Sequence, residues 1–144
     1  MRKTIALAAC TAALAIPIAD ATAALQAKAA PKKKIVTITK TVTGQAAQAD
    51  RWGFVQVALV VKKTTTIVGT RKTVVRKITG VKVPVYPNHT DRSVFINQQA
   101  LPLLVQETLS AQFTGGVNMI SGASNTSDAF ITSLQGALTL AHRV

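Results

Sequence analysis

Small and hydroxyl-bearing residues gather in the stretch 118–127, directly before a predicted C-terminal helix. The loop within this stretch reads Ser121, Gly122, Ala123 and Ser124. Because the loop lacks bulk, a ligand can approach its backbone closely, and the free N–H groups in the first turn of a helix form a site for phosphate. A hydroxyl placed there can bind phosphate or be esterified by it. We also expect Thr126 and Ser127 to cap the helix, and capping alone accounts for such residues at many helices.

Acid–base or metal chemistry has little support elsewhere in the sequence. Beyond residue 23 the carboxylates are Asp50, Asp91, Glu107 and Asp128, and the imidazoles are His89 and His142. His89 and Asp91 form the one close pair, and their turn-rich surroundings favour a solvated loop over a metal site. We therefore expect no metal site and no catalytic residues, and a hydrolase is disfavoured.

Three segments with apolar residues at every second position are predicted to be strands that precede the helices. They cover residues 35–42, 55–61 and 73–86. Pro84 cannot donate a hydrogen bond to a neighbouring strand, so the third strand is expected to lie at an edge or to end there. The alternation shifts by one residue at Gly80, which indicates a β-bulge.

Two helices are predicted after the strands, and they complete the fold class. The first carries Leu101, Leu104 and Leu109 on one side, with Pro102 either in its first turn or inside a longer helix that begins near Ser93. It is expected to end at 114–116, and the second helix is expected over 127–141. Strands followed by helices predict an α+β protein, a single small domain in which two helices pack on one face of an antiparallel sheet.

The N-terminus has the pattern of a secretory signal peptide. A basic start, an apolar run at 4–18 and small residues near 19–23 predict a signal peptide over 1–23, which implies an extracytoplasmic protein, either secreted or held at the cell surface or in the periplasm. Two alternatives remain open, namely retention of the apolar run as a membrane anchor and lipidation at Cys10. Residues 24–34 form an Ala- and Lys-rich linker, and 35–144 form the domain.

The chain is strongly basic. Its 17 Lys and Arg residues against 5 Asp and Glu residues give a formal charge of +12, so partners attracted over long range are anionic. The cations concentrate in or beside the predicted strands, at Lys62, Lys63, Arg71, Lys72, Arg76, Lys77, Lys82 and Arg92. Lysines that protect sheet edges from aggregation explain part of this pattern, and a site for an anionic polymer is the alternative. No nucleic-acid motif is present, so we do not expect nucleic acid as the partner.

Three motifs, in order along the chain, resemble one protein family. They are R-W-G-F-V-Q-V at 51–57, I-N-Q-Q-A-L-P at 96–102 and S-G-A-S-N-T-S-D-A-F-I-T-S-L-Q-G-A-L at 121–138. Together they are similar to the FMN-binding domain family, the extracytoplasmic flavin domains that also occur in sodium-translocating NADH:quinone reductase. The resemblance covers roughly residues 44–141, with about ten extra residues around 64–75, and is greatest to small exported bacterial members.

The resemblance implies both a cofactor and the residues that hold it. The implied FMN site consists of Ser121, Gly122, Ala123, Ser124, Thr126, Ser127, Trp52, Asn97 and Gln98. In the family a separate exported flavin transferase uses FAD to form a phosphoester at the position that Ser124 occupies, where threonine is usual. Asn118 also stands where the transferase's recognition motif usually has aspartate, so covalent and non-covalent attachment both remain open. Trp52 would cover the flavin ring, and Asn97 and Gln98 would bond to its polar edge.

Two functions from different classes follow. The first is an extracytoplasmic electron-transfer domain that carries FMN and has a flavin transferase and membrane or extracellular redox proteins as partners. The second is a basic module that binds an anionic cell-envelope polymer or lipid. An enzyme that turns over a nicotinamide substrate has less support, because the sequence has no dinucleotide fingerprint.

Overall fold

The computed structural model describes residues 30–144. The predicted signal peptide at 1–23 and most of the linker at 24–34 lie outside the described residues. The compact unit that contains the described strands and helices spans Lys32–Val144.

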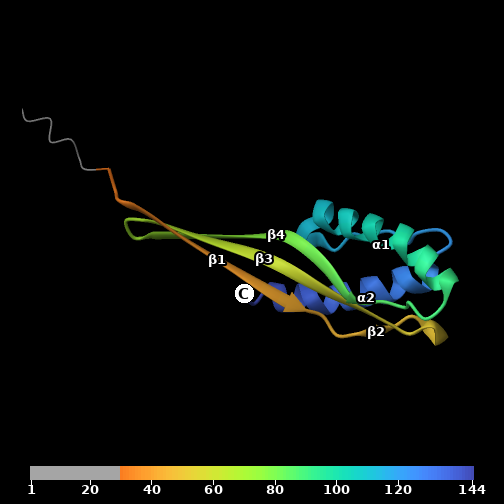
Figure 1. Cartoon of the computed structure of the whole chain (residues 1–144). Helices are drawn as coiled ribbons and strands as arrows, with labels where there is room; N and C mark the ends of the chain where they lie inside the picture. Colours follow the sequence, from red (N-terminus) through yellow and green to blue (C-terminus); the bar gives the residue numbers. More distant parts are fainter. Residues whose placement is uncertain (1–29) are drawn as a thin grey trace, which may run out of the picture. The chain divides into compact units, whose positions relative to one another are not determined.

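Four strands precede two α-helices along the described chain (Figure 1). The strands are β1 (Lys33–Thr43), β2 (Ala47–Gln48), β3 (Phe54–Val68) and β4 (Arg71–Val85), and the helices are α1 (Asp91–Ala111) and α2 (Ser124–Ala141). Short 3-10 turns lie at η1 (Asp50–Trp52) and η2 (Gln112–Thr114). All pairing is antiparallel, with β1 and β4 along most of β3 and β2 beside its first residues. The predicted α+β class, with an antiparallel sheet, two helices and one small domain, is confirmed.

The last predicted strand, at 73–86, corresponds to β4, and both features expected there, an edge position at Pro84 and a β-bulge near Gly80, are present. Within the described sheet β4 pairs with β3 alone, so it is an edge strand, and Pro84 is its next-to-last residue. The pairing passes from Val60 opposite Gly80 to Val61 opposite Ile78, so one extra residue bulges from β4 at this point. The strands are longer than predicted, because β3 and β4 continue through 62–72 to a turn at Gly69 and Thr70.

The core lies between one face of β3 and the two helices. Alternate residues of β3, namely Val55, Val57, Leu59 and Val61, are fully buried. They belong to a single apolar cluster with Ile78 of β4, Leu104 of α1, and Phe130, Leu134 and Ala137 of α2. Burial of these side chains is the main stabilising contribution. It also fixes both helices on the same face of the sheet, as predicted.

A glycine between β1 and β2 sets how closely α2 approaches the sheet. A Cβ atom at Gly44 would lie 2.1 Å from the carbonyl oxygen of Ser133. The hydroxyl of Ser133 accepts a hydrogen bond of 2.9 Å from the backbone N–H of Val57 in β3. Helix α2 is therefore held against the sheet at one register, and this register positions its first turn.

Helix α1 takes the longer of the two predicted forms. Thr90 is its N-cap and accepts a hydrogen bond of 3.2 Å from the N–H of Ser93, and Pro102 lies inside the helix. Pro102 is exposed, and it removes one backbone N–H from the middle of the helix. After Ala111 the chain continues through η2 to Gly115, which has a left-handed conformation with φ of 65°. Neither α1 nor α2, the two α-helices of the described chain, is long and apolar enough to span a bilayer.

Candidate functional site

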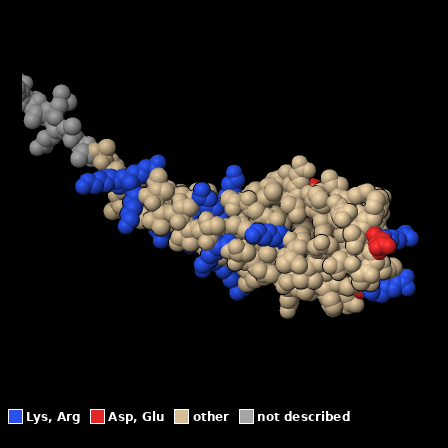
Figure 2. Space-filling view, viewed as in Figure 1, with Lys and Arg blue, Asp and Glu red and all other residues tan. Residues whose placement is uncertain are grey.

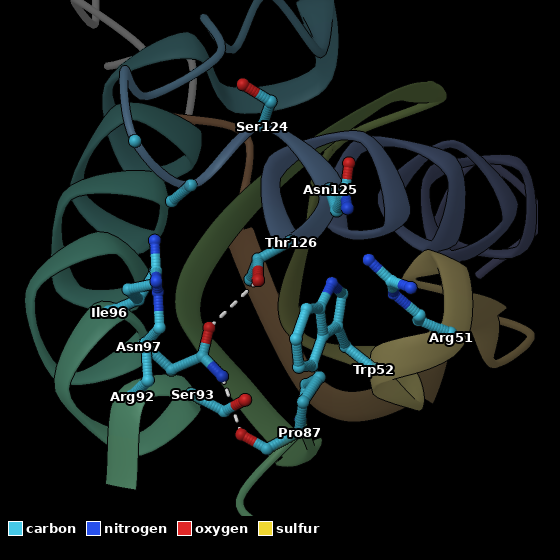
Figure 3. Close-up of a pocket in the computed structure, with 12 residues that line it drawn as sticks. Arg51, Trp52, Pro87, Arg92, Ser93, Ile96, Asn97, Ser124, Asn125 and Thr126 are labelled. Carbon is cyan, nitrogen blue, oxygen red and sulfur yellow. Dashed lines mark hydrogen bonds between the residues drawn. The ribbon is translucent and has the colours of Figure 1, made fainter. Parts of the chain in front are cut away.

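A pocket opens where the start of α2, the first turns of α1, the η1 turn and the β4–α1 connection meet (Figure 3). Its volume is about 600 Å³, within the range typical of small-molecule sites. The lining residues are Arg51, Trp52, Pro87, Arg92, Ser93, Ile96, Asn97, Gly122, Ala123, Ser124, Asn125 and Thr126. The pocket thus combines an aromatic ring, aliphatic side chains, hydroxyls and two guanidinium groups.

The η1 turn presents Arg51 and Trp52 to the pocket. The turn is closed by hydrogen bonds from Ala49 N–H to the Gly53 carbonyl (2.7 Å) and from Trp52 N–H to the Ala49 carbonyl (3.1 Å). Gly53 has φ of 122°, a value that favours glycine. The guanidinium carbon of Arg51 lies 5.3 Å from the centroid of the Trp52 ring, within cation–π range. The half-buried indole therefore forms a flat wall with a positive charge beside it.

A buried hydrogen-bond network ties together three of the pocket's elements. The Thr126 hydroxyl donates to Asn97 Oδ1 (3.0 Å), and Asn97 Nδ2 donates to the Pro87 carbonyl (2.6 Å), as the dashed lines in Figure 3 show. Asn97 is only 2% exposed, so both bonds are shielded from water. Its amide has two N–H donors, and only one is used by Pro87.

The first turn of α2 differs from the sequence prediction. The helix begins at Ser124 rather than Ser127, and its N-cap is Ala123, which makes no side-chain capping bond. The expectation that Thr126 and Ser127 cap the helix is therefore wrong, since both lie inside its first turn. Their hydroxyls bond elsewhere, with Thr126 donating to Asn97 and Ser127 Oγ accepting from the N–H of Ile120 at 3.1 Å.

Backbone donors remain at the start of α2 because no side chain caps it. The first helical bond runs from Ser127 N–H to the Ala123 carbonyl at 2.9 Å. The N–H groups of Ser124, Asn125 and Thr126 precede this bond, and all three residues line the pocket. The positive end of the helix dipole lies at the same place. This arrangement suits an anionic group.

The loop before α2 is open toward solvent. Gly122 has φ of 83°, and no heavy atom of the described chain lies within 4 Å of the position that a Cβ atom would take there. Its conformation, rather than lack of space, favours glycine at this position. Ser124 is exposed, and Figure 3 shows its hydroxyl directed away from the Trp52 ring, toward the outer side of the pocket.

Six of the nine residues predicted to bind the cofactor line this pocket. They are Trp52, Asn97, Gly122, Ala123, Ser124 and Thr126. Ser121 and Gln98 are exposed and lie outside the lining, and Ser127 is fully buried beneath the loop.

Two arginines in the pocket were missed as site residues by the sequence analysis. Arg51 was noted only as part of the motif at 51–57, and Arg92 was grouped with the cations in or beside the predicted strands. That grouping is wrong for Arg92, which belongs to the first turn of α1. Helical spacing could have found it, because Arg92, Ser93, Ile96 and Asn97 fall on one face of a helix. The lining has two cationic side chains and no carboxylate, so the pocket favours an anionic ligand that also has a flat apolar part.

Comparison of the chain with protein-family models, with curated proteins and with solved structures finds no match. The resemblance to FMN-binding domains therefore stays a prediction.

Proposed function

We propose that the domain binds FMN in this pocket and acts as an extracytoplasmic electron-transfer domain. The observation that carries the proposal is one pocket holding a half-buried tryptophan, two arginines, uncapped helix N–H groups and an exposed serine. FMN has the complementary parts, a flat aromatic ring system and a terminal phosphate.

The residues present fit the two ends of FMN. Trp52 would contact the ring through its indole face, and Ile96 and Pro87 add apolar surface. The phosphate would be held by the N–H groups that begin α2 and by guanidinium charge from Arg92 or Arg51. The second N–H of Asn97 is available to a polar atom of the ligand.

The chemistry supplied by bound FMN would be one- and two-electron transfer. The chain's own residues would bind and orient the cofactor and set the polarity around it. The pocket lining includes no carboxylate or imidazole for acid–base catalysis on a substrate. An electron carrier therefore fits this lining better than an enzyme with a substrate of its own.

Ser124 is the proposed anchor if attachment is covalent. Its Oγ would form a bond to the flavin-side phosphorus of FAD, the bond from that phosphorus to the AMP portion would break, and AMP and the hydroxyl proton would leave. The exposure of Ser124 at the outer side of the pocket supports access for a separate transferase. Redox partners would then be other extracytoplasmic or membrane proteins.

The test is co-expression with an exported flavin transferase, followed by intact mass and a visible spectrum. We expect a yellow protein whose mass rises by one FMN less one water. Ser124→Ala should lose the mass gain, whereas Ser121→Ala should keep it, because Ser121 lies three residues away and outside the lining. Unshifted protein that binds added FMN would establish non-covalent binding, and folded protein that takes up no flavin by either route would refute the proposed function.

A further inference from the structure

The strands β1, β3 and β4 continue beyond the helices as a three-stranded ribbon (Figure 1). We define the basic ribbon as residues 33–40 and 62–77. It contains nine Lys and Arg residues and no Asp or Glu: Lys33, Lys34, Lys40, Lys62, Lys63, Arg71, Lys72, Arg76 and Lys77. In Figure 2 blue Lys and Arg side chains are spread along the ribbon, and the red carboxylates visible in that view lie over the helical part.

One face of the basic ribbon points away from the helices, and four of the nine cations lie on it in two rows: Lys33, Lys62, Arg71 and Lys77. The strand register places Lys62 directly opposite Lys77, and Val68 at the tip opposite both Lys33 and Arg71. These residues alternate with the core positions Val61 and Ile78, so they share the outward face. Between the two rows this face carries threonines and two aliphatic side chains. Ile35 is 56% exposed and Val75 is 58% exposed.

Protection of sheet edges explains only part of this charge, because seven of the nine cations lie on the edge strands β1 and β4 and two do not. Lys62 and Lys63 belong to β3, the central strand, whose edges are already paired. The register also places Lys63 directly opposite Arg76. Strands β3 and β4 therefore bring together two pairs of like charges, Lys62 with Lys77 and Lys63 with Arg76. Such pairs destabilise a sheet. Lys63 bonds to an oxygen of Val144 at 2.7 Å, whereas Lys62 and Lys77 lie on the outward face, where an external anion would relieve their repulsion.

We infer that the outward face of the basic ribbon docks on an anionic lipid bilayer. Cations alone would suit any polyanion, but exposed Ile35 and Val75 lie between the two cationic rows, and this mixture is typical of surfaces that enter the headgroup region. The basic ribbon has no aromatic residue on which the bases of a nucleic acid could stack. In addition, β1 begins at the tip, so the preceding chain, with its apolar run at 4–18, joins the domain at this same end.

This inference does not depend on flavin binding, because the basic ribbon and the pocket share no residue. Membrane docking would place a redox domain beside membrane partners, and it would equally serve a domain without a cofactor.

A probe on the basic ribbon distinguishes lipid contact from general binding. The full chain with Cys10→Ser would carry an environment-sensitive fluorophore at Val75→Cys, and a matched protein would carry it at Asp128→Cys in α2. Vesicles of phosphatidylglycerol and phosphatidylcholine should shift the emission at position 75 to the blue, and brominated lipid should quench it. Position 128 and vesicles of phosphatidylcholine alone should show neither effect.

Charge variants test the cations by vesicle sedimentation. Lys62→Glu should weaken binding to anionic vesicles by about tenfold or more, because each cation near an anionic surface contributes to attraction. It should leave the fold intact, since it replaces a like-charge pair with an attraction between the introduced carboxylate and Lys77. Arg143→Glu is the control, because it changes the net charge equally and the exposed Arg143 follows α2, on the helical side of the sheet. We expect it to keep nearly all of the binding.

Two results would overturn the inference. One is an emission at position 75 that stays unchanged with anionic vesicles. The other is equal weakening by Lys62→Glu and Arg143→Glu, which would indicate attraction by net charge alone. Strong binding of soluble polyphosphate together with an unchanged emission on vesicles would assign the basic ribbon to an anionic polymer instead.

Discussion

Replacement of Gly44 by alanine should destabilise the domain through a clash between two backbone segments. The added Cβ would lie 2.1 Å from the Ser133 carbonyl oxygen and 3.1 Å from the Ala137 nitrogen. Both neighbours belong to the backbone of α2, so no rotamer change can relieve the contact. The helix or the β1–β2 connection has to move by ~0.9 Å to reach even 3.0 Å, the short limit for Cβ contacts.

The cost can be estimated from what this movement disturbs. Overpacking in a close-packed core costs about 1–3 kcal/mol. The same shift would lengthen the hydrogen bond from Val57 N–H to Ser133 Oγ from 2.9 Å to about 3.8 Å, which loses about 1 kcal/mol more. Alanine also restricts the unfolded chain more than glycine does, which stabilises the folded protein by about 0.4–1 kcal/mol and offsets part of this loss. We therefore expect a net loss of about 2 kcal/mol for Gly44→Ala.

Urea unfolding followed by circular dichroism measures this loss, and Gly80→Ala is the matched control. Gly80 lies in the edge strand β4, and its added Cβ would meet the Val60 side chain at 3.5 Å, an ordinary contact. Its free energy of unfolding should stay within about 1 kcal/mol of the parent protein. A Gly44→Ala protein as stable as the Gly80→Ala protein would refute the close packing of α2 on the sheet.

Three further predictions concern the pocket and the loop beside it. Trp52→Ala should weaken FMN binding about tenfold, measured by quenching of flavin fluorescence, while Trp52→Phe should keep most of it; equal loss in both would show that ring contact is not the cause. Thr126→Val leaves Asn97 Oδ1 without its donor and should lower the free energy of unfolding by about 1–3 kcal/mol. Thr126→Ser keeps the hydroxyl and should lower it by less than about 1 kcal/mol. Similar losses of stability in the two variants would contradict a role for the hydroxyl. Ser127→Ala removes the acceptor of the Ile120 N–H, so hydrogen exchange at that amide should accelerate at least about fivefold, with Ser121→Ala as the unchanged control.

The sheet was predictable where one face of a strand is buried. Val55, Val57, Leu59 and Val61 alternate because every second side chain enters the core, and that pattern is visible in the sequence. The segment 62–72 was not predicted, because lysines and threonines occupy both faces there and no apolar alternation remains. Its strand conformation follows from pairing with β1 and β4, which a local pattern does not reveal.

The candidate site was predictable as a loop but not as a pocket. Small residues before a helix identified the segment that contains Gly122 and Ser124, since glycine and serine have local conformational reasons to be there. The first turn of α2 was misassigned because the hydroxyls of Thr126 and Ser127 bond to Asn97 and to the preceding loop instead of capping the helix. Such partners are set by tertiary contacts, and so is the placement of Arg92 beside the loop.

The pocket and the tip of the basic ribbon lie at opposite ends of β3, and this separation makes their roles independent. Trp52 lies two residues before Phe54, the first residue of β3, and Val68 ends the strand, so the two ends of β3 are about 46 Å apart for 14 steps of ~3.3 Å. Surface charges are screened over about 8–10 Å at physiological salt, so the tip cations should have little effect on an anion in the pocket. That anion would depend on Arg51, Arg92 and the start of α2, while an anionic surface would meet the basic ribbon first. A domain docked in this way would keep its pocket open to a partner away from that surface.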